Sequence, residues 1–303
     1  MNIQWYPGHM VKAKRKIMEE LKLVDIVIEL LDARIPMSSR NPEIENIVGN
    51  KKRIIVLNKS DLADPAINME WIDYFNREDK KAIPVDSVSG KGLKDILSAS
   101  GQLMKEKLNR LKSKGLLLKT VRALIIGIPN VGKSTLINKL AGRNAAQTGD
   151  KPGITKAKQW IKVGPELELL DTPGILWPKF EDERAGMNLA FTGAIKDEIL
   201  DINRLSQELL AILADKYPEK LNSRYKLGEN EADIAPGKLM EIIGRKRGCI
   251  ISGGDIDMHR VSALLLDEFR CGKIGRISLE SPKEFLKNIP INYTRGNKEQ
   301  DEY

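Results

Sequence analysis

The chain has 303 residues, of which 41% are hydrophobic and 30% charged, a composition typical of a folded protein with a substantial core. No run of about 18 apolar residues is present, and the only cysteines, Cys249 and Cys271, form no CxxC pair, which excludes a membrane span and a disulfide scaffold. The net charge is +8, and residues 1–180 hold 31 basic against 20 acidic residues. We therefore expect a cytoplasmic protein with a polyanionic partner, nucleic acid or a nucleotide.

The first part of the chain alternates apolar runs with amphipathic segments. Four apolar runs are expected to form strands, at 24–31, 53–57, 82–86 and 121–128. Four other segments are expected to form helices, at 10–22, 43–49, 67–77 and from 93 to about 108. Because the apolar runs are nearly continuous, both faces of each strand should be buried, which is typical of a parallel sheet between helices.

The pattern changes in the second part of the chain. Two short strands are expected at 159–163 and 167–170, and no strong strand appears between 184 and 271. Apolar residues there recur at helical spacing. The sequence thus predicts an α/β fold with a mostly parallel sheet and a smaller all-α domain. The expected division is a first domain over 1–178, a helical domain over 179–287 and a polar tail over 288–303.

Residues 127–134 read Gly-Ile-Pro-Asn-Val-Gly-Lys-Ser, between an expected strand and an expected helix. The spacing G-x-x-x-x-G-K-S in this context indicates a P-loop, whose backbone N–H groups and helix N-terminus bind phosphates. Lys133 is expected between the β- and γ-phosphates and Ser134 on Mg²⁺. The remaining residues expected to contact phosphate are Asn130, Val131, Gly132, Thr135 and Gly174.

Asp171 and Gly174 belong to the sequence Asp-Thr-Pro-Gly that follows the expected strand at 167–170. In a P-loop protein an Asp at the end of a strand holds Mg²⁺, usually through water. Gly174 can bring its backbone N–H to the γ-phosphate. We therefore expect Asp171 to be a magnesium-site residue.

Two further motifs follow strand ends and point to guanine. Asn58-Lys59-Ser60-Asp61 ends the strand at 53–57, and the carboxylate of Asp61 can accept both the N1–H and the N2–H₂ of guanine. Adenine offers no such pair of donors, so ATP should be rejected. The segment Ser87-Val88-Ser89-Gly90-Lys91-Gly92 should close over the base, with a backbone N–H near Val88 meeting O6. The expected guanine-binding residues are Asn58, Lys59, Asp61, Ser87 and Val88.

The four motifs are those of a Ras-like GTPase in rotated order, with the base-reading motifs first, as in circularly permuted GTPases. The segments WYPGHM, LLDARIPMSSRNP, TGDKPGIT, TGAIKD and KRGC extend the match over residues 1–285. The chain resembles the bacterial ribosome biogenesis GTPase A (YlqF-type) family. The resemblance implies a GTPase that binds the large ribosomal subunit late in its assembly, with a helical domain that helps to bind rRNA. It also implies that Thr155, in KPGIT, is the switch threonine and a Mg²⁺ ligand.

The group that activates water is less evident. Small GTPases place a Gln just after the DxxG motif, but this chain has Ile175 there. His9 is the best candidate, because a His near its ordinary pKa can hydrogen-bond or shuttle a proton at neutral pH. The alternative is that His9 packs the WYPGH segment or contacts rRNA. Asn130 is a candidate ligand for a K⁺ ion near the phosphates, and its alternative role is to stabilise the loop.

The rotated motif order has a mechanical consequence. The chain leaves the Asp-Thr-Pro-Gly motif directly into the helical domain, so a γ-phosphate-dependent movement at Gly174 would displace that domain. The basic segments at 12–16, 51–53, 105–119 and 245–247 are the candidate RNA surface.

Three functional readings remain open. The leading one is a GTPase switch on the large subunit, a monomer when off the ribosome and not bound to membranes. The second is a GTP-stabilised rRNA-binding placeholder in which hydrolysis is incidental. The third, a P-loop kinase of a small molecule, leaves the NKSD and DTPG motifs unexplained.

Overall fold

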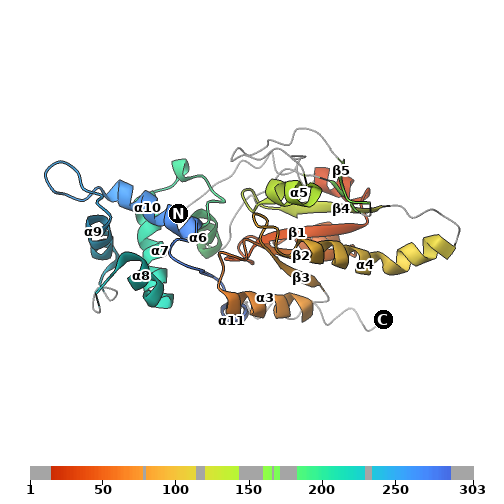
Figure 1. Cartoon of the computed structure of the whole chain (residues 1–303), viewed down its shortest axis with the longest axis horizontal. Coiled ribbons are helices and arrows are strands. Elements are labelled where there is room, and N and C mark those ends of the chain that lie inside the picture. Colours follow the sequence, from red (N-terminus) through yellow and green to blue (C-terminus); the bar gives the residue numbers. More distant parts are fainter. Residues whose placement is uncertain are drawn as a thin grey trace.

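The computed structural model describes residues 15–77, 80–113, 120–142, 160–165, 167–170, 183–228 and 234–287. Figure 1 shows the sheet and its covering helices on one side and helices α6–α10 on the other. The last described helix, α11, Pro282–Lys287, returns to the sheet side and lies against α3.

The described strands form one six-stranded sheet in the order β3-β2-β1-β4-β6-β5. The strands are β1 (Ile26–Asp32), β2 (Lys52–Asn58), β3 (Lys81–Val85), β4 (Val121–Gly127), β5 (Trp160–Val163) and β6 (Leu167–Leu170). All neighbouring pairs are parallel except the edge pair β5–β6. The carboxyl ends of five strands therefore point to the same edge of the sheet.

Helices cover both faces of the sheet because the side chains of each strand alternate between two apolar layers. On β1, Ile28 belongs to the cluster that includes residues of α4 (Leu93–Ser113) and α5 (Lys133–Ala141). Val27 and Leu31 face the opposite layer, which is formed by the helix at 15–21, by α2 (Ile44–Val48) and by α3 (Pro65–Arg77). This two-sided burial explains the unbroken apolar runs of the central strands.

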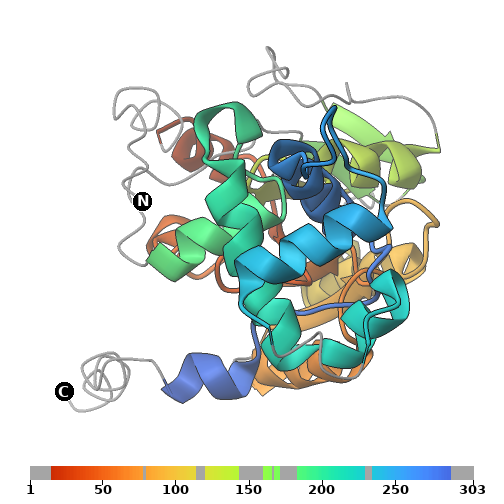
Figure 2. The same cartoon turned by 90° about the vertical axis from the view of Figure 1, so that its left-hand side faces the viewer.

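The second half of the described chain is helical. Its elements are α6 (Glu183–Phe191), the 3₁₀ turn η1 (Asp197–Ile199), α7 (Ile202–Lys216), α8 (Pro218–Tyr225), α9 (Pro236–Lys246) and α10 (Met258–Arg270). Asp201 caps α7 and Asp257 caps α10, each through a side-chain oxygen that accepts backbone N–H groups of the first turn. Helices α7, α9 and α10 pack together (Figure 2).

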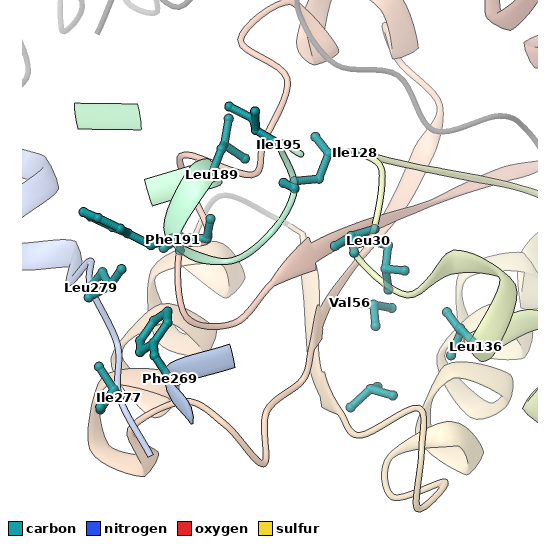
Figure 3. Packing of buried hydrophobic residues seen from close by; sticks show 14 of the residues in the cluster. Leu30, Val56, Ile128, Leu136, Leu189, Phe191, Ile195, Phe269, Ile277 and Leu279 are labelled. Atoms are coloured by element: carbon teal, nitrogen blue, oxygen red, sulfur yellow. The ribbon is translucent and has the colours of Figure 1, made fainter. Parts of the chain in front are cut away.

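The main apolar core is continuous between the sheet and the helices. Leu30 and Ile128 at the carboxyl edge of the sheet share a cluster with Leu189 and Ile195 of the helical half, and with Phe269 of α10 (Figure 3). Burial of one such side chain contributes about 1.5–3 kcal/mol. The sheet and the helices are therefore joined by packing at the edge where the motif loops lie.

The α/β architecture with a mostly parallel sheet and a following helical region confirms the predicted fold class. Strand ends agree with the prediction within two residues, whereas α4 ends at Ser113 rather than near 108. The segment 105–113 contains no Gly or Pro, so nothing in it stops the helix. The predicted domain boundary after residue 178 and the predicted tail at 288–303 lie outside the described residues. Within the described parts of the chain, no helix is long and apolar enough to cross a membrane.

Candidate nucleotide site

The strand register brings the predicted motifs to one edge of the sheet. Asp32 at the end of β1 pairs with Asn58 at the end of β2, which pairs in turn with Val85 at the end of β3. Gly127, the last residue of β4, pairs with Leu30 of β1. The loops that follow β2, β3 and β4 therefore leave the sheet next to one another, where doubly wound sheets bind their ligands.

The P-loop connects β4 to α5 through residues 128–132. Gly132 has φ +101° and Asn130 φ +58°, so the backbone turns through the left-handed region twice before α5 begins at Lys133. The Nζ of Lys133 donates to the carbonyl oxygens of Gly127 and Ile128, at 3.0 and 2.7 Å. Lys133, Ser134 and Thr135 form the first turn of α5, whose backbone N–H groups suit an anion. The residues present fit a bound phosphate chain.

Asn58 ties three motifs together. Its Nδ2 donates to the carbonyl of Val131 in the P-loop at 2.7 Å. Its Oδ1 accepts from the backbone N–H and the hydroxyl of Ser87, at 3.2 and 2.6 Å. A Cβ on Gly132 would lie 2.3 Å from Asn58 Nδ2, so only glycine fits there. The base-reading loops and the phosphate loop therefore share one side chain.

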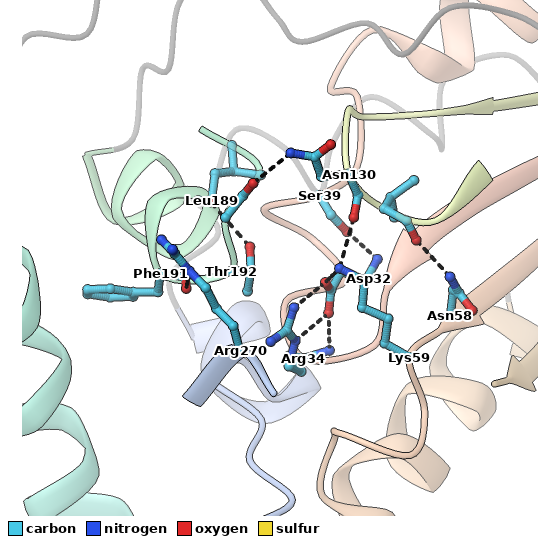
Figure 4. A network of polar contacts seen from close by, with 12 residues as sticks. Asp32, Arg34, Ser39, Asn58, Lys59, Asn130, Leu189, Phe191, Thr192 and Arg270 are labelled. Atoms are coloured by element: carbon cyan, nitrogen blue, oxygen red, sulfur yellow. Dashed lines mark hydrogen bonds and ion pairs between the residues drawn. The ribbon is translucent and has the colours of Figure 1, made fainter. Parts of the chain in front are cut away.

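Lys59 provides a second link through its ammonium group. The Nζ donates to the carbonyl of Asn130 at 2.9 Å and lies 3.2 Å from Oδ2 of Asp32 (Figure 4). Asp32 also accepts a two-pronged bond from Arg34, at 2.9 and 2.8 Å. Burial alone would raise the pKa of Asp32, but Arg34 and Lys59 hold it well below its usual range. Asp32 thus stays charged and fixes Lys59 beneath the P-loop.

Sequence reasoning did not assign roles to Asp32 and Arg34. A usable pattern was present, since a charged residue at the end of a continuous apolar strand sits where a sheet of this type binds ligands. The guanidinium of Arg34 lies 5.4 Å from the ring centroid of Phe269 on α10. The ion pair of Asp32 and Arg34 therefore connects the nucleotide site with α10 of the helical half.

The base-reading residues lie on neighbouring loops. Partial burial and the nearby carboxylate of Asp86 raise the pKa of Asp61, which lies on the loop after β2. Val88, predicted to offer its N–H to guanine O6, donates that N–H to Oδ1 of Asp86 at 2.8 Å, and Ser89 donates to the same oxygen at 3.1 Å. Asp86 therefore shapes the loop that is expected to close over the base.

The P-loop also contacts the helical half. Asn130 Nδ2 donates to the carbonyl of Gly193 at 3.0 Å. Arg270, which lies beside Phe191 in Figure 4, orders that turn. Its guanidinium donates to the carbonyls of Ala190 and Phe191 and pairs with the carboxylate of Asp197. The side chain of Asn130, predicted to bind K⁺, thus donates a hydrogen bond from its amide nitrogen to the turn after α6.

Four predicted site residues, His9, Thr155, Asp171 and Gly174, lie outside the described residues. Among the residues that the structure does describe, no cluster of three or more His, Cys, Asp or Glu side chains suits a metal ion. The predicted Mg²⁺ ligand set therefore has only Ser134 among the described residues.

The site can be compared with known proteins. A family model described as "50S ribosome-binding GTPase" matches residues 122–232. A relative named Ribosome biogenesis GTPase A from Bacillus cereus is 53% identical over 289 residues, covering 95% of this chain and 97% of the relative. The relative of that name from Thermotoga maritima is 33% identical, covering 97% of this chain and all of its own length.

Two solved structures share the fold. Crystalline GNP-bound YlqF from T. maritima has a TM-score of 0.62 at 30% identity, covering 90% of this chain and 99% of its own. A GDP-bound YlqF structure has a TM-score of 0.65 at 29% identity and covers 89% of this chain. Each of these two YlqF structures holds a bound guanine nucleotide or its analogue.

Proposed function

The chain belongs to the ribosome biogenesis GTPase A family, and from this membership we propose that it binds the large ribosomal subunit late in assembly and uses GTP hydrolysis to drive docking and release. It is a GTP hydrolase that acts in ribosome biogenesis. The observation that carries the proposal is the 53% identity over nearly the full chain, together with the four strand ends that meet at one edge.

In the proposed site each motif has a defined role. Asp61 accepts guanine N1–H and N2–H₂, and Asn58 and Lys59 hold the base-reading loop against the P-loop. Ser87 and Val88 close over the base. The residues Asn130, Val131, Gly132, Lys133, Ser134, Thr135 and Gly174 bind phosphate.

Ser134, Thr155 and Asp171 are the proposed residues for Mg²⁺, which when bound neutralises charge on the phosphates. Ser134 fits this role because it lies in the first turn of α5, directly after Lys133. The chain's own part is to orient the γ-phosphate, through Lys133 and the backbone N–H of Gly174.

Water activation is assigned to His9, with packing or an rRNA contact as its alternative role. Asn130 is the proposed K⁺ ligand. His9→Ala should leave GTP affinity intact and lower turnover, and replacement of K⁺ by Na⁺ should slow turnover.

The proposed rRNA surface rests on the basic segments. On α9, Arg245 and Lys246 are exposed, and Lys52 is exposed at the start of β2. Exposed cations that neutralise phosphates bind RNA with a strong salt dependence. We further propose that the protein is cytoplasmic and monomeric when off the ribosome.

The proposal is tested by GTP turnover of the full chain in K⁺ buffer, alone and with purified large subunits, small subunits or tRNA. Stimulation on the order of 10³-fold, by large subunits alone, is the expected result. Ile175 in the place of a catalytic Gln favours the alternative of an rRNA-binding placeholder. That alternative replaces the switch if large subunits bind in a GTP-dependent manner but leave turnover unchanged.

A further inference from the structure

The segment 274–281, here called the strap, runs from the end of α10 back to the loop that carries Asp61. Ile277 donates its N–H to the carbonyl of Leu62 at 2.8 Å, and the hydroxyl of Ser278 accepts the N–H of Asp64 at 3.0 Å. Gly272 lies two residues before the strap, and a Cβ added to it would lie 2.7 Å from Cδ2 of Leu62. The strap and the loop 60–64 are therefore in close backbone contact.

Arg276 grips the same loop with its side chain. Its Nε donates to the carbonyl of Ala63 and its terminal nitrogen to the carbonyl of Ser60, both at 2.9 Å. These two carbonyls lie on either side of Asp61 in the sequence. The guanidinium therefore spans the turn whose tip is the proposed guanine reader.

The helical half holds the strap from the other side. The hydroxyl of Tyr217, at the end of α7, donates to the carbonyl of Ser278 at 2.9 Å and accepts its N–H at 3.2 Å. Lys220 of α8 donates to the carbonyl of Arg276 and lies 3.5 Å from the carboxylate of Asp64. The strap is thus fixed between α7–α8 and the base-reading loop.

We propose that Arg276 is a positioning residue for guanine selection, supplied to the base-reading loop by the helical half of the chain. The proposal rests on the proposed role of Asp61. A carboxylate that accepts two N–H groups at once must be held in one orientation, since a small rotation breaks one of the two bonds. Arg276 fixes the backbone on both sides of Asp61 and so sets that orientation.

The proposed role of Arg276 predicts that its loss affects the binding of GDP and of IDP differently. GDP presents both N1–H and N2–H₂ to Asp61, whereas IDP lacks the 2-amino group and offers only N1–H. Loss of the Arg276 contacts should therefore weaken the binding of GDP more than the binding of IDP. A residue that merely stabilised the fold would weaken both ligands equally.

The test compares Arg276→Gln and Arg276→Lys with the control Arg260→Gln in the full chain. Arg276 and Arg260 are both exposed, so neither substitution should unfold the protein. We expect Arg276→Gln to weaken the binding of GDP about threefold to tenfold, from the loss of two charged-donor hydrogen bonds. The binding of IDP should weaken by less than about twofold, Arg276→Lys should recover part of the selectivity, and Arg260→Gln should change the binding of neither ligand.

Equal weakening of GDP and IDP by Arg276→Gln, or no change in either, would overturn the proposal. The melting temperature of each variant, measured alongside, separates a loss of fold from a loss of selection. Asp61→Asn tests the underlying assignment independently, since it should transfer preference from GDP to XDP. Retained GDP preference in Asp61→Asn overturns the role of Asp61, whereas an XDP switch with an inert Arg276→Gln overturns only the role of Arg276.

Discussion

The helical half meets the nucleotide site at two places that differ in kind. At the base-reading loop the contact consists of several hydrogen bonds. The backbone N–H of Ile277 and the side chain of Arg276 donate to the loop, and the hydroxyl of Ser278 accepts the N–H of Asp64. At the P-loop, among the described residues, it consists of the bond from Asn130 to Gly193 and of apolar packing of Ile128.

The difference indicates how each end of the nucleotide is held. Several directional hydrogen bonds fix one relative position, whereas apolar contacts are non-directional and tolerate sliding. We infer that the base end is held rigidly to the helices and that the phosphate end is free to respond to the γ-phosphate. This division is compatible with the proposal that Gly174 moves the helical half on GTP binding.

The largest effect, on GDP binding, is expected where the P-loop meets the base-reading loop. Gly132→Ala places a Cβ 2.3 Å from Asn58 Nδ2 at a residue with φ +101°. We expect GDP binding to fall by roughly 100-fold or more, because both backbone strain and the clash disrupt the P-loop. Isothermal titration measures this loss. The control Gly101→Ala, in α4 with open space around it, should bind GDP normally and melt at the same or a higher temperature.

A smaller effect, on the stability of the whole protein, is expected at Glu280, the residue that anchors the strap (274–281) to the sheet half. The carboxylate of Glu280 accepts from the backbone N–H groups of Met37 and Ser38 and from Asn188 Nδ2. Glu280→Ala removes the acceptor of the Met37 and Ser38 N–H groups and one of the two acceptors of Asn188, which should lower the free energy of unfolding by about 2–4 kcal/mol. Urea denaturation measures the change.

The matched control for the anchor is Glu198→Ala. Glu198 has a side chain that is 83% exposed and lies 4.0 Å from Lys196, so its loss should change stability by less than about 0.5 kcal/mol. If Glu280→Ala were as mild as this control, the strap would not be held as described.

The smallest effect is expected at the P-loop contact. Asn130→Gly keeps the left-handed backbone, with φ +58°, and removes the bond to Gly193. We expect a stability change of about 1 kcal/mol or less, with the helical half displaced in solution scattering. A loss of stability as large as that of Glu280→Ala would contradict the contrast between the two junctions.

Most of the fold was predictable because each strand and the P-loop is encoded by one short, continuous stretch of sequence. The strands β1, β2 and β4 are nearly continuous apolar runs, and the P-loop has a fixed spacing of glycines and Lys133. The helix α4 extends past its predicted end near residue 108, because the segment 105–113 holds no residue that stops a helix.

The strap was not predictable for a physical reason. The strap belongs to no helix or strand of the structure, and the partners of Arg276 are backbone carbonyls, which any sequence supplies. Glu280 and Asn188 likewise pair across 92 residues of chain, with no local pattern to link them. Long-range polar contacts of this kind become visible only when the topology is known.

Hydrogen exchange with GDP and with a non-hydrolysable GTP analogue tests the contrast between the two junctions most directly. We predict that exchange in 192–196, beside the P-loop, changes with the γ-phosphate, while exchange in 60–64, under the strap, stays the same. Equal changes in both segments, or a change confined to 60–64, would contradict it.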